Sequence, residues 1–205
     1  MKHLFFLAML LLTSCSKDDS ATNKIFSLPP ETQVGANTFG VTINGRVYIP
    51  RDSNSSSYNW WGSGGNKKGM VWWGGGIIPN EYKELEVIDG ASVPGFQIVL
   101  HIQNLDQIGI GQYILKQSNF QNQAYSVLEN HIFFRIYDTN INNYAYYGSI
   151  ENQGVINITR NDVINYIVSG NFSGKFMRFD NPNEFITITD GRFDIGPGLY
   201  SKIFP

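Results

Sequence analysis

The sequence predicts an all-β domain, an antiparallel β-sandwich or β-barrel of about nine to eleven strands. Apolar residues alternate with polar or small residues in short segments, and Gly, Asn, Asp or Pro stands between the segments. No part of the 205-residue chain shows convincing helical periodicity. Because the strands of a sandwich and of a barrel show the same alternation, the two-residue period of apolar residues does not distinguish between the two architectures.

The first expected strands form a hairpin at residues 38–50. Apolar residues alternate with polar or small ones from Phe39 to Ile43, and Asn44 and Gly45 follow. This dipeptide is a strong hairpin signal, because both central positions of the turn favour positive φ. Later strands are expected, in chain order, at residues 84–89, 95–103, 111–115, 131–138, 154–160, 165–176 and 184–195.

Two Asx-rich segments between strands are expected to form turns. Residues 138–143 begin like a calcium loop, but Asn143 replaces the glycine of the sharp turn and Ser149 replaces the bidentate glutamate. A hairpin turn is therefore favoured there. Residues 180–184 have the same composition and the same interpretation.

The second half of the closing strand contains a Gly and three charged residues. Asp190 and Gly191 suit a tight turn. Arg192 and Asp194 stand two residues apart and therefore share one face of the strand. They are expected to form a surface pair, and the alternative is that they bind a ligand anion.

The N-terminal residues 1–14 have the layout of a lipoprotein signal peptide. Lys2 precedes an apolar run from Leu4 to Leu12, and small residues then precede Cys15. Nine apolar residues rise only about 14 Å as a helix, whereas a bilayer span needs roughly 20 residues. The run is therefore too short to be a membrane-spanning helix.

The residues that end in Cys15, LTSC, resemble the bacterial lipobox, in which the thiol receives a diacylglycerol and the peptidase cuts before the cysteine. Cys15 is the only cysteine in the chain, so the expected lipidation with acyl chains such as palmitate consumes it and no disulfide is predicted. We expect the chain to be held at a membrane through this N-terminal lipid anchor.

Residues 15–37 are expected to be the lipidated cysteine and a flexible tether, and residues 38–205 a single all-β domain. The tether has low hydrophobicity and contains Pro29–Pro30. Its start, Cys-Ser-Lys-Asp-Asp, resembles the export signal that sends Bacteroidota lipoproteins to the outer face of the outer membrane. The expected location is the cell outer membrane, with the domain displayed at the cell surface; a periplasm-facing anchor is the alternative.

Four segments of the domain are similar to a family of uncharacterised Bacteroidota outer-membrane lipoproteins. They are NTFGVTINGRVYIP at the start, IGQYIL in the middle, and IVSGNFSGKF and ITITDGRFDI at the end. Members of this family often carry cysteine where this chain has Val41. The family has no assigned activity, so the resemblance implies fold class and location but no mechanism.

Composition argues against several function classes. The formal net charge is −2, from 15 basic and 17 acidic residues, and no basic run exceeds Lys67–Lys68, so nucleic-acid binding is not expected. No nucleophile elbow, phosphate loop or paired-histidine zinc motif is present. Neither an enzyme activity nor a cofactor or metal is therefore predicted.

The two histidines of the domain, His101 and His131, fall in expected strands. The pair might meet if these strands were neighbours, but neither histidine has a carboxylate at a ligand-like spacing in the sequence. They are interpreted as solvated or packed strand residues, with a zinc or general-base role as the alternative.

All four tryptophans lie within residues 57–76, as two doublets. Neighbours in a strand point to opposite faces, so one ring of each doublet cannot enter the core. If the doublets pair as a hairpin, two rings could form an exposed aromatic platform beside a tyrosine. The alternative is that both faces are covered. The candidate ligand-binding residues are Tyr58, Trp60, Trp61, Trp72 and Trp73.

The function expected from the sequence is a non-enzymatic binding module for a glycan or peptide, displayed on the outer membrane. The alternative is a structural or accessory envelope protein that acts through protein-protein contacts.

Overall fold

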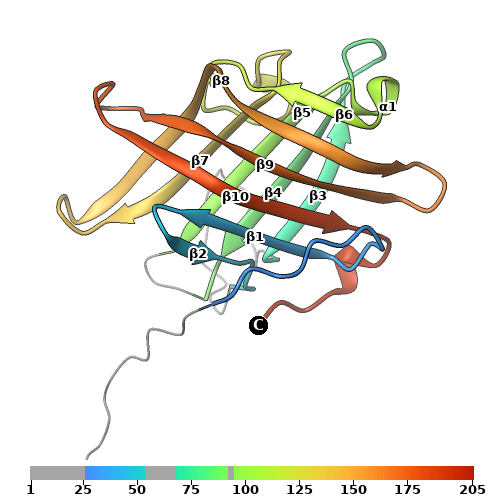
Figure 1. Ribbon diagram of the computed structural model, residues 1–205, viewed down its shortest axis with the longest axis horizontal. Coiled ribbons are helices and arrows are strands. Elements are labelled where there is room, and N and C mark those ends of the chain that lie inside the picture. The colour runs from blue at the N-terminus through green and yellow to red at the C-terminus, as the bar shows by residue number, and fades with distance from the viewer. Residues whose placement is uncertain (1–25, 54–67, 92–94) are drawn as a thin grey trace, which may run out of the picture.

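The computed structural model describes residues 26–53, 68–91 and 95–205 (Figure 1). These residues form a strongly curled antiparallel sheet that has the shape of a half-barrel, so the all-β prediction is confirmed. The strands are β1 (Thr38–Ile43), β2 (Arg46–Tyr48), β3 (Met70–Gly75), β4 (Tyr82–Asp89), β5 (Phe96–Gln103), β6 (Gly111–Ile114), β7 (His131–Asp138), β8 (Asn143–Asp162), β9 (Ile167–Arg178) and β10 (Phe185–Ile195). The described residues also contain three short helices: α1 (Leu105–Ile108) between β5 and β6, η1 (Gln123–Tyr125) between β6 and β7, and η2 (Leu199–Ser201) after β10.

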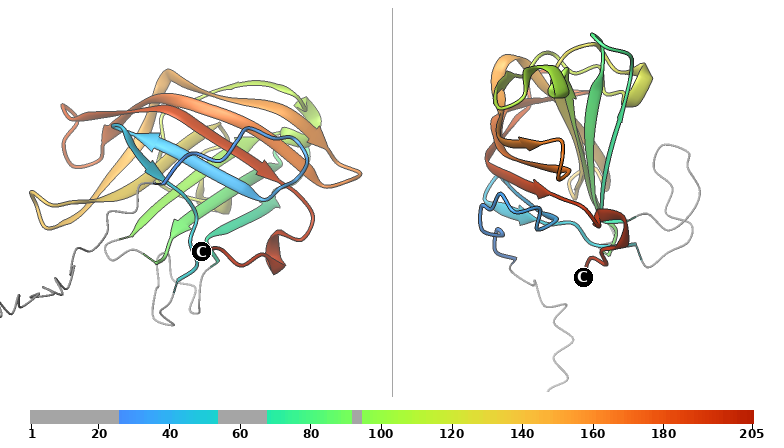
Figure 2. Two further views of the ribbon diagram at one scale, coloured as in Figure 1. Left: turned by 60° about the horizontal axis from the view of Figure 1, so that its bottom comes forward. Right: turned by 90° about the vertical axis from the view of Figure 1, so that its right-hand side faces the viewer.

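The strand order in the described sheet is β2-β1-β10-β9-β8-β7-β5-β4-β3, and β6 pairs with β8 beside this path. Strand β8 is 20 residues long because its first part pairs with β7 and a later part pairs with β6. Its register against β9 shifts twice, which marks bulges in the long strand. This bent strand lies where the sheet folds over, so that β3–β5 face β1, β9 and β10 across the core (Figure 2).

The hydrophobic core fills the inside of the curl. On each core strand alternate residues point inward, as Leu85 and Val87 do on β4 and Ile98 and Leu100 do on β5. Phe134, Phe172 and other aromatic rings complete this core. The intervening residues lie on the outer face of the sheet.

The expected turns occur at three Asn-containing positions of the described chain. Asn44 and Gly45 join β1 to β2 with φ of 45° and 79°, as the hairpin signal predicts. Residues 138–143 form the β7–β8 turn, in which the Asp138 side chain accepts a hydrogen bond from the Asn140 N–H at 2.9 Å. Residues 180–184 form the β9–β10 turn.

The prediction of a tight turn at Asp190–Gly191 is wrong. Strand β10 continues through this dipeptide, and its register against β9 shifts between Ile188 and Gly191, which is a β-bulge. The glycine is needed for packing: a Cβ atom at position 191 would come within 2.4 Å of the Phe172 ring. The local signal for a turn is the same as that for a bulge, and the long pairing with β9 decides between them.

Asp194 is not half of a surface pair with Arg192, because it is 1 % exposed and binds the segment before β1. Its carboxylate accepts hydrogen bonds from the Thr32 hydroxyl at 2.6 Å and from the backbone N–H groups of Val34, Gly35 and Ala36 at 2.9–3.1 Å. The Ser169 hydroxyl donates a further bond at 2.7 Å.

The C-terminal part of the expected tether is therefore docked on the domain. Residues 26–37 run along β1 and β10, and the Arg192 guanidinium donates to the Pro29 carbonyl at 3.0 Å instead of pairing with Asp194. Low hydrophobicity suggests a flexible tether here, but the buried Asp194 carboxylate holds three backbone N–H groups of this segment. Residues 1–25, with Cys15, lie outside the described residues.

In the part of the chain that the structure describes, no helix has the length and apolar character to cross a membrane.

Candidate functional site

The tryptophan doublet of β3 divides between the two faces of the sheet. Trp72 faces inward, opposite Leu85 of β4, and packs partly against the core. Trp73 faces outward and donates its indole N–H to Glu84 at 2.9 Å. The two described rings therefore do not form one platform. The other candidates, Tyr58, Trp60 and Trp61, lie outside the described residues.

A hollow of about 500 Å³ opens next to Trp72, between the two layers of the half-barrel. Its volume is in the range of small-molecule sites, which is roughly 300–1,000 Å³. The wall comes from β3, β4, α1, the β8–β9 turn, the end of β10 and η2, which meet at the right-hand end of the molecule in Figure 1 and face the viewer in the right panel of Figure 2. The lining residues are Trp72, Lys83, Asp106, Asn161, Asp162, Val163, Tyr166, Val168, Ile195, Gly196, Pro197, Gly198, Leu199 and Tyr200.

Three aromatic side chains stand around the hollow. Trp72 is half-buried, whereas Tyr166 and Tyr200 are 76 % and 68 % exposed. The Tyr200 hydroxyl donates a hydrogen bond to the Trp72 carbonyl, which joins η2 to the edge of β3. Tyr166 occupies the β8–β9 turn with a φ of 56°. Aromatic rings with apolar faces and a polar handle are therefore presented at the mouth of the hollow.

Charged side chains line one wall of the hollow. The Lys83 ammonium lies 2.6 Å from Asp106 Oδ2 and 3.9 Å from Glu81 Oε2. The other Glu81 oxygen, Oε1, accepts the Asp106 backbone N–H at 2.7 Å. Burial, with Glu81 and Asp106 nearby, raises the pKa of Tyr113 to about 12. Two carboxylates, Glu81 and Asp106, therefore stand beside the single ammonium of Lys83 at this wall.

Asp162, the last residue of β8, lines the hollow too and is held in its charged form. Its carboxylate accepts hydrogen bonds from Asn165 at 2.9–3.0 Å and from Arg160 at 2.7 Å. These bonds lower the pKa of Asp162 well below its usual range.

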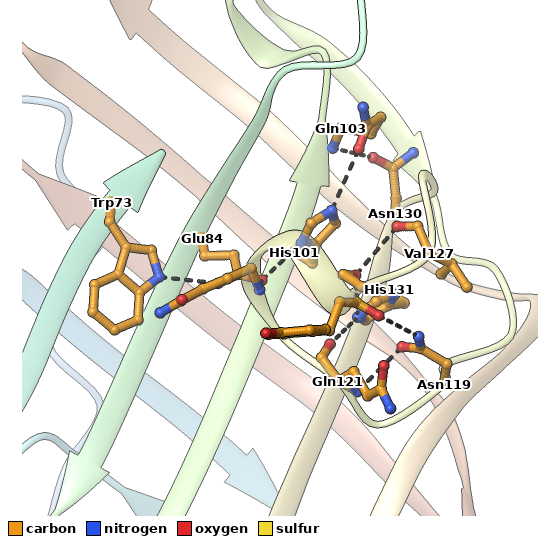
Figure 3. A network of polar contacts seen from close by, with 12 residues as sticks. Trp73, Glu84, His101, Gln103, Asn119, Gln121, Val127, Asn130 and His131 are labelled. Carbon is orange, nitrogen blue, oxygen red and sulfur yellow. Dashed lines mark hydrogen bonds and ion pairs between the residues drawn. The ribbon is translucent and has the colours of Figure 1, made fainter. Parts of the chain in front are cut away.

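On the outer face of the same strands, a row of polar side chains crosses β3, β4, β5 and β7 (Figure 3). Trp73, Glu84, His101 and His131 are consecutive register partners in this row. His101 Nδ1 lies 2.8 Å from Glu84 Oε1, and the two imidazole rings stack with centroids 5.0 Å apart. Strands β5 and β7 are neighbours, so the condition under which the sequence allows the two histidines to meet is fulfilled.

The connection between β6 and β7 covers this row. The Gln123 backbone N–H donates to Glu84 at 2.6 Å, and His131 Nε2 lies 3.3 Å from the Gln121 carbonyl and donates to it. Within the described residues no hydrogen-bond partner reaches His131 Nδ1. Burial, and secondarily His101, lowers the pKa of His131 to about 3.

The polar row is buried and closed, which suits a structural role better than catalysis. Glu84, His101 and His131 are 0–1 % exposed. In the ranges that the structure describes, no group of three or more His, Cys, Asp or Glu side chains is arranged to hold a metal ion. The histidines are packed strand residues, as one of the two interpretations states.

Sequence reasoning missed Glu84 because this carboxylate comes from a neighbouring strand and not from a nearby position in the chain. A signal was present: Glu84 and Glu86 alternate with Leu85 and Val87 on a strand that is buried on both faces. Buried carboxylates require partners, and the polar residues of β5 are the nearest choice.

A second groove, of about 310 Å³, lies beside this row. It is lined by Gly76, Ile77, Asn80, Tyr82, His101, Gln123, Ala124, Ser126, Val127 and Leu128. None of these residues is a carboxylate, lysine or arginine. The groove therefore offers fewer groups for polar recognition than the hollow at Trp72 does.

No protein-family model matches the sequence, and the searches of curated proteins and of solved structures give no significant match either.

Proposed function

We propose that the protein is an outer-membrane lipoprotein, anchored through acyl chains on Cys15, that acts as a non-enzymatic binding module at the cell surface. The anchor is supported by the basic start, the short apolar run and the lipobox-like LTSC. The resemblance to uncharacterised Bacteroidota lipoproteins supports the same location.

The ligand that fits the hollow best is a glycan. The observation that carries this proposal is the combination of three aromatic side chains, Trp72, Tyr166 and Tyr200, with carboxylate and amide groups around one open hollow. The apolar face of a sugar ring stacks on an aromatic ring, while hydroxyl groups bond to side-chain oxygens. Tyr166 and Tyr200 are exposed at the mouth, so a sugar ring can contact them without disturbing the core.

The test is calorimetric titration of the intact chain in mild detergent with neutral oligosaccharides. Tyr166→Ala should weaken binding by about tenfold, which corresponds to about 1.4 kcal/mol of lost stacking. Tyr125→Ala is the matched control, because Tyr125 is 77 % exposed, close to the 76 % of Tyr166, but lies on η1 and does not line the hollow. Equal effects of the two variants would refute the hollow as the binding site.

A second candidate is an accessory protein that acts through protein-protein contacts. The observation that favours it is the apolar tip of the β8–β9 turn, where Val163 and Ile164 are 59 % and 83 % exposed. Ile164→Ser should leave glycan affinity unchanged under the first function. Under the second, the same variant should abolish a stoichiometric complex with a purified envelope partner.

A further inference from the structure

We propose that the glycan bound in the hollow carries a free amino group, and that the hollow disfavours acidic glycans. This inference rests on the proposed function and names the ligand class for the same site.

The first step concerns Lys83, the positive side chain on the wall of the hollow. Its ammonium is held 2.6 Å from Asp106 and 3.9 Å from Glu81, so its charge is already offset by two carboxylates. A ligand carboxylate would have to compete with both for the same ammonium. An acidic sugar therefore gains little from Lys83 and meets the repulsion of the two acids.

The second step is the balance of charge on the lining itself. The lining carries one ammonium, Lys83, and two carboxylates, Asp106 and Asp162. Asp162 shares its charge with Arg160, which is not part of the lining. The side chain of Asp106 is 40 % exposed and has only one cation, Lys83, within ion-pair distance among the described residues. A ligand cation is attracted to this carboxylate from the open side.

The third step is a buried acceptor behind the same wall. Glu81 is 6 % exposed, and its Oε2 faces Lys83 without a hydrogen-bond partner in the described part of the chain. A buried carboxylate oxygen without a donor is unfavourable. If a ligand ammonium binds Asp106, Lys83 can shift toward Glu81 and donate to this oxygen. The ligand ammonium, Asp106, Lys83 and Glu81 would then form a row in which basic and acidic groups alternate.

The experiment compares four β-1,4-linked tetrasaccharides: glucose, glucosamine and N-acetylglucosamine, which differ from glucose at C2, and glucuronate, which differs from glucose at C6. The intact chain is titrated with each at pH 6, where the free amine is protonated. The glucosamine tetramer should bind about tenfold more tightly than the glucose tetramer, and the glucuronate tetramer more weakly than both. The preference should also decline at high salt.

Three variants test whether the charged wall of the hollow causes the preference for glucosamine over glucose. Asp106→Asn should remove the advantage of glucosamine over glucose, whereas Lys83→Met should increase it, because the repulsion from the lysine is lost. Glu151→Gln makes the same change of charge as Asp106→Asn at an exposed residue of β8 outside the hollow, and should leave the preference intact. Circular dichroism confirms that each variant is folded.

The outcomes separate this inference from the proposed function. If all four tetramers bind alike, or glucuronate binds most tightly, the amino-group inference is wrong and glycan binding in the hollow stands. If the preference survives Asp106→Asn, this wall does not produce it, and the inference is again wrong. If none of the tetramers binds, both the inference and the proposed glycan function are contradicted.

Discussion

Trp72 and Trp73 are neighbours in sequence but belong to two different environments. Trp73, on the outer face, is the first member of a closed row in which Glu84 accepts three hydrogen bonds at 2.6–2.9 Å. Trp72, on the inner face, borders an open hollow of about 500 Å³. The outer row is an internal polar network, whereas the inner face leaves room for a ligand.

The comparison shows that the degree of burial, and not the residue type, distinguishes a charged side chain with a structural role from one that is available to bind a ligand. Both faces of β4 carry charged side chains, Glu84 outward and Lys83 inward. Glu84 is fully buried and saturated with donors, while Lys83 and its partner Asp106 are 24 % and 40 % exposed. Removal of a buried partner destabilises the fold, but an exposed pair contributes little to stability and can exchange partners with a ligand.

The largest expected effect is at Glu84, whose loss tests whether the outer row is structural. Glu84→Ala removes the acceptor of the Trp73, His101 and Gln123 N–H groups and should lower the free energy of unfolding by about 3–5 kcal/mol. Urea unfolding measures this difference, and Glu84→Gln, which retains one acceptor oxygen, should recover part of it.

The matched control is Glu151→Ala, which removes an exposed carboxylate paired with Lys116. It should leave the urea midpoint unchanged. A Glu84→Ala variant as stable as Glu151→Ala would mean that the outer row is not a stabilising network, and the contrast between the faces would then be lost.

The second expected effect is a decrease in the free energy of unfolding at acidic pH, which is caused by the protonation of His131. Its pKa is lowered from an ordinary 6.5 to about 3 in the fold, so between these values the unfolded chain binds a proton that the folded chain does not. The stability should therefore fall as the pH decreases from about 6.5 toward 3, with a slope that approaches 1.4 kcal/mol per pH unit.

Urea unfolding at a series of pH values, with His131→Gln as the comparison, measures this contribution. The variant lacks the titrating ring, so its stability should decline less steeply than that of the parent chain between pH 6 and pH 4. Parallel pH profiles for the two proteins would exclude His131 as the source.

The smallest effect separates the two tryptophans directly. Trp73→Phe removes one hydrogen bond to Glu84 and should cost about 1 kcal/mol of stability without a change in glycan affinity. Trp72→Phe should instead weaken glycan binding and remove the ligand-induced change in tryptophan emission. If the emission response is lost with Trp73→Phe and kept with Trp72→Phe, the ligand binds on the outer face.

Fold class and several turns could be predicted from sequence because they depend on local chemistry. Alternation identified most strands, and Asn44–Gly45 identified the first hairpin. The bulge at Gly191 and the docked segment at Asp194 were not predictable, because both depend on which strands lie side by side. Strand order also brings Glu84 to His101, across 17 positions of the chain.

For the candidate site, too, the local features were predictable from the sequence and the long-range ones were not. The sequence showed that the rings of a doublet must separate, which β3 confirms for Trp72 and Trp73. It could not show the hollow, because the lining comes from segments as distant as Lys83, Tyr166 and Tyr200. These segments meet only when the sheet curls.

The attachment of residues 32–36 to Asp194 has a mechanical consequence if the chain is anchored at Cys15, as we propose. A pull between the proposed anchor and the domain would then pass through the segment before β1. That load would reach one carboxylate on which four donors of the segment converge, so the four bonds would share it. Under the proposed anchorage, Asp194 would therefore take up the pull before it reaches the pairing of β1 with β10.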